Sequence, residues 1–305
     1  MSCVFGPVPS RRLGRSLGVD LIPFKTCTYD CVYCQIGCTP QTSVDRKEWI
    51  PVDQVIEELR EKLASGPDYI TLSGSGEPTL YAQIGALVER IKAMTDIPIA
   101  VITNGSLLWR EEVRRELLGV DLVVPSLDAG DEAAWRAANR PHESLTFARM
   151  LDGLVDFRRE FKGQYWLEVF LLGGLTDTDE AVGKLAACAA RIGPDRVQLN
   201  TVTRPPAERS AQAVPPDRLA EIATLFTPRA EVIAEFHKAE PSAERTAGQT
   251  EILDMLRRRP CSLKDIADGL GISPHQAAKH IEELNTAKAI TVTEVNGTLY
   301  YKPVE

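Results

Sequence analysis

The chain has 305 residues, with 35 Lys and Arg against 43 Asp and Glu, giving a net charge of −8. This length suggests about two domains, and the acidic balance argues against a broadly basic nucleic-acid-binding surface. No run approaches the ~18 apolar residues of a membrane span. Arg11, Arg12, Arg15 and Asp20 interrupt any apolar core of a secretory signal, so we expect a cytoplasmic protein.

Short apolar, β-branched runs alternate with longer amphipathic stretches, as in parallel strands joined by crossover helices. The expected strands are 18–22, 69–73, 97–103, 121–125, 166–172 and 196–202. The expected helices between them are 52–64, 84–94, 111–118, 145–161 and 180–192. Six strands in series predict an α/β fold, a partial (β/α)6 TIM-like barrel. An open doubly wound sheet is the alternative.

The C-terminal part of the chain follows a different pattern. Helices are expected over 250–258, 263–270 and 273–286, and Asn296-Gly297 is a turn signal between two short β runs. Three helices and a hairpin predict a small winged helix-turn-helix domain over residues 241–305, after a barrel domain over residues 1–240. Segment 241–248 is expected to be the linker, and a short apolar piece at 232–236 is expected to close the barrel domain.

The charge of the predicted winged helix weighs against the usual use of that fold. Residues 241–305 contain eight Lys and Arg against nine Asp and Glu, whereas DNA-binding modules are usually more basic. The run Arg257–Arg259 is expected to be a solvated helix end. A protein- or peptide-docking role or a dimerisation role for the module is therefore favoured over nucleic-acid binding.

Four of the seven cysteines lie between Cys27 and Cys38, a clustering typical of metal or redox chemistry. Cys27, Cys31 and Cys34 follow the first expected strand with the spacing C-x3-C-x2-C. Three thiolates on one loop can bind three irons of a [4Fe–4S] cluster and leave the fourth iron open. A zinc site with Cys38 as its fourth ligand is the alternative.

The segment Cys27-Thr-Tyr-Asp-Cys31-Val-Tyr-Cys34 resembles the signature of the radical S-adenosylmethionine (SAM) superfamily. Residues 73–78, after the second expected strand, are similar to its glycine-rich "GGE" segment, and residues 103–105 and 126–129 follow the next two strands in order. The amino-terminal run 5–18 and segments 139–142 and 200–206 resemble the branch of wyosine-synthase-like iron–sulfur oxidoreductases. The sequence has no second cysteine triplet, so the resemblance does not imply that this chain forms the tricyclic wyosine base of tRNA.

The resemblance implies a [4Fe–4S] cluster on Cys27, Cys31 and Cys34, with SAM bound to the open iron. One electron from the cluster would cleave SAM to methionine and a 5′-deoxyadenosyl radical, which abstracts hydrogen from a substrate. A reductant such as flavodoxin or ferredoxin is implied as a partner. The implied cofactor-binding residues are Tyr33 near the adenine, Gly74, Gly76 and Glu77 at the methionine moiety, and Asn104, Ser126 and Asp128 at the ribose or methionine.

The substrate is left open by the sequence, with a peptide, a protein or RNA docked by the winged helix as the expectation. Arg11, Arg12 and Arg15 either contact an anionic substrate or form a solvated arm. Further candidates at expected strand ends are Arg140, Glu168, Gln198, Asn200 and Arg204. The alternative function is a regulator whose cluster senses redox state and whose winged helix binds DNA, which leaves the ordered motifs of the barrel unexplained.

Overall fold

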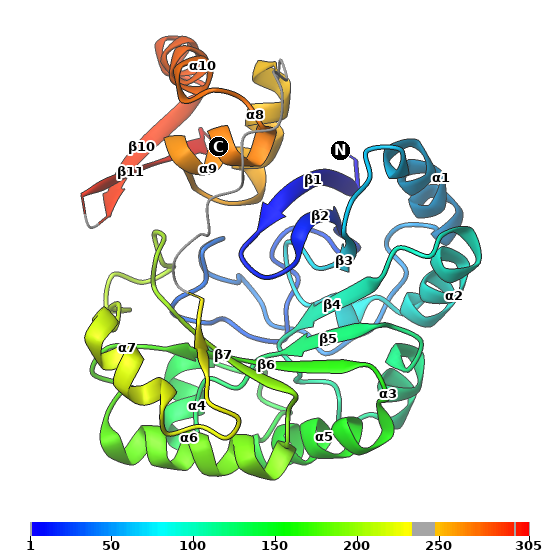
Figure 1. The fold of residues 1–305 in the computed structure, drawn as a ribbon, viewed down its shortest axis with the longest axis vertical. Helices are drawn as coiled ribbons and strands as arrows, with labels where there is room; N and C mark the ends of the chain where they lie inside the picture. The colour runs from blue at the N-terminus through cyan, green and yellow to red at the C-terminus, as the bar shows by residue number, and fades with distance from the viewer. Residues whose placement is uncertain (1, 234–247, 296, 305) are drawn as a thin grey trace.

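The computed structural model describes residues 2–233, 248–295 and 297–304 (Figure 1). Eight strands form one sheet whose spatial order follows the chain from β1 to β8. β1 (Val4–Ser10) and β2 (Gly14–Val19) pair antiparallel, and every later neighbouring pair is parallel. A sheet whose strands lie in the order of the chain is typical of a TIM-like barrel. In a doubly wound sheet the strand order reverses direction at one point within the sheet, so the doubly wound alternative is wrong.

The parallel strands alternate with helices that cover the outside of the sheet (Figure 1). The further strands are β3 (Tyr69–Leu72), β4 (Ile99–Thr103), β5 (Leu122–Pro125), β6 (Gln164–Leu171), β7 (Arg196–Thr201) and β8 (Glu231–Val232). The helices are α1 (Val52–Leu63), α2 (Ile84–Met94), α3 (Glu111–Leu117), α4 (Glu132–Asn139), α5 (Phe147–Glu160), α6 (Asp179–Ile192) and α7 (Pro216–Ala223), with the 3-10 helix η1 (Pro78–Leu80).

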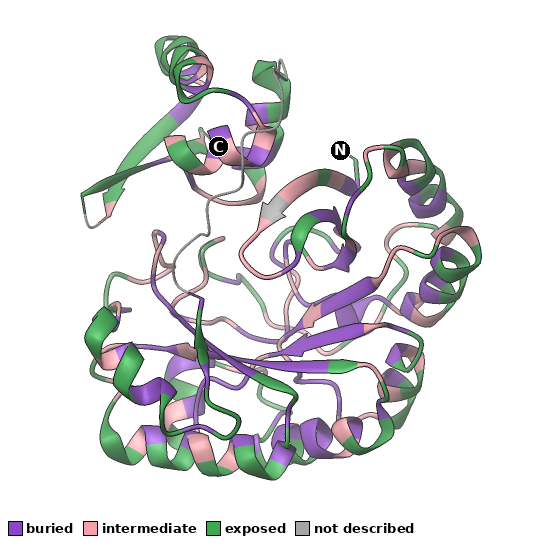
Figure 2. Ribbon diagram, viewed as in Figure 1, coloured by how far each residue is buried: buried purple, intermediate pink, exposed green. Residues whose placement is uncertain are grey.

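Helix α6 illustrates why these segments fold as they do. The Thr178 side chain accepts a hydrogen bond from the Ala181 amide, and Gly193 ends the helix with a left-handed φ of 70°. Val182 and Leu185 are buried at helical spacing. Figure 2 shows the same division across the barrel, with buried residues along the sheet and exposed residues on the outer helix faces.

Three features of the barrel differ from the expectation. The first parallel strand is Gly14–Val19 rather than 18–22. Neither β1 nor α4 was predicted from the sequence. β1 contains two prolines, which normally indicate a loop, but it is an edge strand, where prolines are tolerated. α4 begins after Asp131, whose side chain accepts a hydrogen bond from the Ala134 amide at 2.9 Å.

Residues 248–304 form what we term the C-terminal module. Its elements are α8 (Gln249–Arg258), β9 (Cys261–Ser262), α9 (Leu263–Leu270), α10 (Pro274–Thr286), β10 (Ile290–Val295) and β11 (Thr298–Pro303). The three strands form an antiparallel sheet in the order β10-β11-β9, over a separate apolar cluster that includes Ile252, Ile266 and Leu284. The predicted boundary after residue 240, most of the predicted linker 241–248 and residues 234–236 lie outside the described residues.

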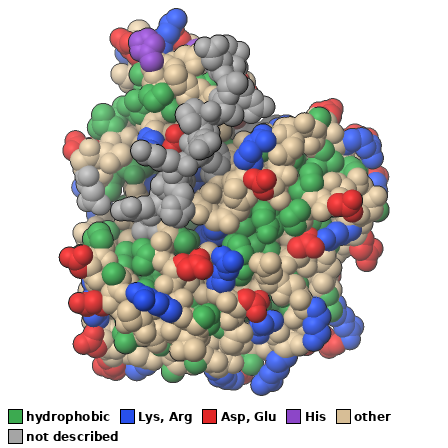
Figure 3. All heavy atoms as spheres, in the orientation of Figure 1, with side chains coloured by type: hydrophobic (Ala, Val, Ile, Leu, Met, Phe, Trp, Pro, Cys, Tyr) green, Lys and Arg blue, Asp and Glu red, His purple; other side chains and the backbone are tan. Residues whose placement is uncertain are grey.

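The surface carries charges of both signs. Figure 3 shows acidic and basic side chains interspersed over the visible face of the barrel. Within the described part of the chain, no helix combines the length and the apolar character that a bilayer crossing requires.

Candidate functional site

The three cysteines of the predicted cluster lie on the loop that follows β2, which we term the cluster loop (residues 25–38). Each sulfur has a hydrogen-bond donor from this chain. Asn104 Nδ2 lies 3.6 Å from Cys27 Sγ, Asn139 Nδ2 lies 3.4 Å from Cys31 Sγ, and Lys25 Nζ lies 3.9 Å from Cys34 Sγ. Donors of this kind favour the thiolate, which is the form that binds metal.

The surroundings of these thiols fit a positively charged group. Burial raises the pKa of Cys27 to about 12, and nearby Glu77 raises it further. Burial also raises the pKa of Cys31 well above its ordinary value, with Cys27 and Cys34 adding to the effect. Coordination to a metal removes such protons outright. A loop of three thiols, each with a side-chain donor to its sulfur, therefore fits the binding of a cluster through three of its irons.

The zinc alternative finds less support. Cys38, which would be the fourth zinc ligand, is exposed. Among the residues that the structure describes, no group of three or more His, Cys, Asp or Glu side chains converges closely enough to hold a metal ion. A [4Fe–4S] cluster spaces its thiolates further apart than a single ion does, because each thiolate binds a different iron.

Glu77 is placed to tie two loops together. Its side chain is buried and accepts hydrogen bonds from Thr79 N at 3.0 Å, Thr79 Oγ1 at 2.6 Å, Thr103 Oγ1 at 2.5 Å and Asn104 N at 2.7 Å. Burial raises the pKa of Glu77 even though these donors lower it. The carboxylate therefore links the loop after β3 to the loop after β4, a role that the sequence did not indicate.

The two glycines of the glycine-rich segment have a packing reason within the protein. A Cβ at Gly74 would lie 2.2 Å from Asp20 Oδ1, and a Cβ at Gly76 would lie 1.8 Å from the carbonyl oxygen of Thr26. Asp20 is held there by the Ser75 amide and hydroxyl, at 3.1 and 2.6 Å. These contacts alone require glycine at both positions, before any approach of a cofactor is considered.

Asp128 organises the aromatic wall next to the cluster loop. It is buried, and it accepts hydrogen bonds from the Tyr33 hydroxyl, from Asn139 Nδ2 at 2.7 Å and from the Phe170 amide at 3.0 Å. The Tyr33 ring stacks on Phe170 with centroids 4.0 Å apart and planes at 12°. Burial raises the pKa of Asp128 to about 6, although the three hydrogen bonds lower it.

Asn104 and Ser126, the other two polar residues predicted to contact the cofactor, have different neighbours. Asn104 faces the cluster loop, since its Nδ2 donates to Thr28 Oγ1 at 2.7 Å as well as to Cys27. Ser126 follows β5, and its amide donates to the Thr103 carbonyl at 3.0 Å. The structure thus brings Asn104 to the cysteines and leaves Ser126 at the next strand end.

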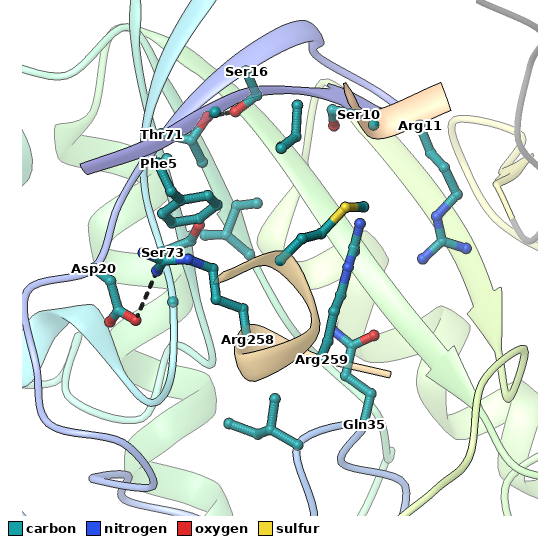
Figure 4. Close-up of a pocket in the computed structure, with 18 of the residues that line it drawn as sticks. Phe5, Ser10, Arg11, Ser16, Asp20, Gln35, Thr71, Ser73, Arg258 and Arg259 are labelled. Carbon is teal, nitrogen blue, oxygen red and sulfur yellow. Dashed lines mark hydrogen bonds and ion pairs between the residues drawn. The ribbon is translucent and has the colours of Figure 1, made fainter. Parts of the chain in front are cut away.

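A cavity of about 620 Å³ lies beside the cluster loop, between the barrel and the C-terminal module (Figure 4). Of the predicted cluster and cofactor residues, Cys34, Tyr33 and Gly74 line it. The others do not line it: Cys27, Cys31, Gly76, Glu77, Asn104, Ser126 and Asp128. Its volume falls within the ~300–1,000 Å³ range of small-molecule sites. We term this space the arginine cavity, because five arginines line it: Arg11, Arg12, Arg204, Arg258 and Arg259.

The amino-terminal arginines divide between the cavity and the surface. Arg12 forms an ion pair with Glu168 at 2.5 Å and also donates to Gln198 Oε1 at 3.3 Å. Burial raises the pKa of Glu168, but Arg12, Asn200 and Arg11 bring it below its ordinary value. Arg15 instead donates to the carbonyl oxygens of residues 65 and 66. Only the first two arginines of this run therefore remain candidates for a substrate contact.

Several residues of the candidate site were not identified from the sequence. Lys25 and Asn139 donate to cysteine sulfurs, and Phe170 stacks on Tyr33. The expectation of a solvated helix end at 257–259 is wrong for Arg258 and Arg259, which line the cavity. Arg140, a predicted strand-end candidate, is on the surface, where it pairs with Glu208.

Comparison with known proteins agrees with this geometry. The family model described as the radical SAM superfamily matches residues 21–189, which include the cluster loop. A UPF0026 protein of Methanocaldococcus jannaschii is 40% identical over 230 residues, covering 74% of this chain and 71% of that protein. A Brachyspira hyodysenteriae protein named GTPase Obg is 39% identical over 303 residues, covering 98% of this chain. This chain spans only 45% of that relative.

A solved structure has the same barrel. The radical SAM methyltransferase from Sphaerobacter thermophilus aligns with a TM-score of 0.56 at 17% identity, covering 73% of this chain and 67% of that one. At this identity the likeness concerns the fold alone. The family match covers more than half of the sequence. The chain therefore belongs to the radical SAM superfamily, whose enzymes use a [4Fe–4S] cluster and SAM.

Proposed function

We propose that this chain binds the cluster through Cys27, Cys31 and Cys34 and abstracts hydrogen from a substrate held in the arginine cavity. When bound and reduced, the cluster supplies the electron that cleaves SAM to methionine and a 5′-deoxyadenosyl radical. The observation that carries the proposal is the cluster loop itself. Each of its three sulfurs has a side-chain donor, and Cys34 lines the cavity in which a substrate can be held.

The chain's own residues orient the reactants and limit access of water. The stacked pair Tyr33 and Phe170 forms an apolar wall, and Asp128 fixes that wall by hydrogen bonds to both residues. Glu77 holds the loops after β3 and β4 together behind the cysteines. Rigid walls of this kind keep a reactive species away from solvent and stray donors. The proposed cofactor-binding residues are Tyr33, Gly74, Gly76, Glu77, Asn104, Ser126 and Asp128.

We propose that the C-terminal module is a winged helix-turn-helix that docks on the mouth of the barrel. Its element order, three helices followed by the β10–β11 hairpin, supports this assignment. The module contacts the barrel through the Tyr300 hydroxyl, which donates to the Thr203 carbonyl at 2.6 Å. The sequence-based expectations of a peptide, protein or RNA substrate, a flavodoxin or ferredoxin reductant, a cytoplasmic location and a wyosine-synthase-like branch belong to the same proposal.

The test is anaerobic reconstitution with iron and sulfide, followed by reduction in the presence of SAM. We expect 5′-deoxyadenosine from the wild-type protein, detected by chromatography, and none from the Cys31→Ala variant. Cys188→Ala is the matched control, because Cys188 lies on α6 and its thiol donates a hydrogen bond to the Gly130 carbonyl, at 3.7 Å, rather than contacting the cluster loop. A wild-type protein with an intact cluster and no 5′-deoxyadenosine would overturn the proposal. DNA binding that responds to cluster oxidation would then favour the regulator.

A further inference from the structure

Arg258 is the last residue of α8, and its side chain reaches from the C-terminal module to the barrel. Its guanidinium lies 3.5 Å from the Asp20 carboxylate, donates to the Ser2 carbonyl at 3.1 Å and lies 3.8 Å from the centre of the Phe5 ring. Figure 4 shows Arg258 beside Phe5, with a dashed line from its guanidinium to Asp20. An ion pair, a hydrogen bond and a cation–π contact therefore hold this one side chain against the barrel.

Asp20, the barrel partner of Arg258, directly follows β2 and is largely removed from water. The side chains of Asp20 and Arg258 are only 12% and 16% exposed. Asp20 Oδ2 faces the guanidinium and accepts the Ser75 hydroxyl at 2.6 Å, and Asp20 Oδ1 accepts the Ser75 amide at 3.1 Å. A carboxylate withdrawn from water to this extent is costly without a counter-charge. Loss of the Arg258 charge should therefore weaken the hold of Asp20 on Ser75.

Asp20 also packs against the backbone of the glycine-rich segment, residues 73–78. A Cβ at Gly74 would lie 2.2 Å from Asp20 Oδ1, so the carboxylate fills the space beside that glycine. Because closely packed atoms transmit displacements, a shift of the carboxylate changes the support of the segment. The arginine cavity is lined by both the segment and its supports: Asp20, Ser73, Gly74, Ser75 and Arg258.

The glycine-rich segment is in turn joined to the cluster loop. The Ser75 carbonyl accepts a hydrogen bond from the Lys25 amide at 2.8 Å. Lys25 Nζ lies 3.9 Å from Cys34 Sγ, as described above. A continuous series of contacts therefore runs from Arg258 of the module, through Asp20 and Ser75, to the loop that holds the cysteines.

We propose that Arg258 is a positioning residue through which the C-terminal module sets the conformation of residues 73–78 and the affinity of the barrel for SAM. This inference rests on the proposed function, in which Gly74 and Gly76 contact the methionine moiety of SAM. Arg258 acts through Asp20 and needs no contact of its own with the cofactor. The docked module favours SAM binding, and by thermodynamic linkage bound SAM favours docking of the module.

The first measurement is hydrogen–deuterium exchange, followed by mass spectrometry, of the full-length reconstituted protein without and with SAM. In Arg258→Gln without SAM, the amides of residues 73–77 should exchange roughly 3- to 10-fold faster than in the wild type, because local opening of the segment becomes easier. Arg258→Lys, which keeps the charge but loses the fork, should fall between. Bound SAM should slow exchange at the end of α8 in the wild type and less so in Arg258→Gln.

The second measurement is SAM affinity, by anaerobic isothermal titration calorimetry of the same proteins. SAM should bind Arg258→Gln roughly 3- to 30-fold more weakly than the wild type, the range expected for a residue that acts on a site without touching the ligand. Arg257→Gln is the matched control, because Arg257 is the neighbouring residue, is 45% exposed and pairs with Asp254 of the same helix at 2.8 Å. Its exchange and its SAM affinity should equal those of the wild type.

Tyr300→Phe separates a positioning role from a general loosening of the module. It removes the hydrogen bond to the Thr203 carbonyl, a contact on the loop after β7, and should leave exchange in residues 73–77 unchanged. Unchanged exchange or unchanged SAM affinity in Arg258→Gln would overturn the inference, as would equally faster exchange in Arg258→Gln and Tyr300→Phe. Both measurements are made without turnover, so a failure to form 5′-deoxyadenosine beside Arg258-dependent SAM binding rejects only the radical chemistry.

Discussion

Buried carboxylates and buried arginines have different kinds of partners on the two sides of the cluster loop. Glu77 and Asp128 are 1% and 3% exposed, and each is satisfied by hydrogen bonds from the chain itself. The arginine cavity holds five arginines, of which three pair with the carboxylates Asp20, Glu168 and Asp265. The carboxylates of the first group are enclosed by donors of the chain, whereas the arginines of the second group line an open cavity.

This difference separates scaffold from binding surface. Carboxylates that are saturated by internal donors hold loops in place, and their loss should appear mainly as lost stability. Crowded cations that face a cavity are costly to the protein alone and are typical of a functional site. Substitutions on the two sides should therefore give different kinds of defect.

The largest expected effect is on the cluster loop that lies between the two groups. Cys31→Ala should abolish cluster binding, because two thiols cannot anchor the cluster as three do. The measurement is iron content and the visible absorption of the reconstituted protein. Cys38→Ala, at an exposed position, should retain both. Loss of the metal in both variants would instead favour a four-cysteine site.

The next effect concerns the paired arginines of the cavity. Asp265→Ala removes the carboxylate that pairs with the buried Arg204 and should lower the free energy of unfolding by about 3–5 kcal/mol, measured by denaturant titration. Asp268→Ala on the same helix removes only the pair with Lys264, which is 60% exposed, and should cost about 0.5 kcal/mol. An equal decrease in the free energy of unfolding of the two variants would show that the Arg204–Asp265 ion pair contributes no more to stability than an exposed pair.

The carboxylate network should make stability depend on pH. The pKa of Asp128 rises from its ordinary 3.8 to about 6, so the folded protein holds this proton more tightly than the unfolded chain does. Its stabilising contribution is full below pH ~4 and is lost as the pH rises through ~6. Relative to Asp128→Asn, the wild type should lose about 3 kcal/mol of unfolding free energy over that range. If the free energy of unfolding had the same pH dependence in the wild type and in Asp128→Asn, this prediction would be contradicted.

The smallest expected effect is at Glu77. In Glu77→Gln, the side-chain amide replaces one carboxylate oxygen, and a donor then faces either the Asn104 amide or the hydroxyls of Thr79 and Thr103. Such a mismatch costs about 1–3 kcal/mol and should appear as a lower midpoint of denaturant unfolding. Glu57→Gln on the exposed face of α1 serves as the control, with no change expected beyond ~0.5 kcal/mol.

Local patterns predicted much of the barrel. Helices such as α2 and α6 have apolar residues at regular spacing, and the strands after them are short β-branched runs, so their positions are confirmed within a few residues. β1 was missed because prolines and a glycine hide an edge strand. Its existence depends on pairing with β2, which no local pattern of β1 encodes.

The site was predicted where one segment carries the pattern and missed where distant segments meet. The cysteine spacing lies within eight residues of sequence and predicted the cluster loop directly. Asn139 reaches Cys31 across 108 residues, and Arg259 reaches the cavity only because α8 docks on the barrel. Both arise from tertiary contacts, so a basic helix end appeared solvated, and Asn139 was noted only as part of a segment that resembles a family branch, not as a donor to a cysteine.

The most direct test of the central claim is electron paramagnetic resonance of the reduced, reconstituted protein before and after SAM is added. A cluster held by Cys27, Cys31 and Cys34 has one iron without a protein ligand. The account predicts a reduced-cluster signal whose shape changes when SAM binds that iron. A signal that SAM leaves unaltered, or the same signal in the Cys31→Ala variant, would contradict it.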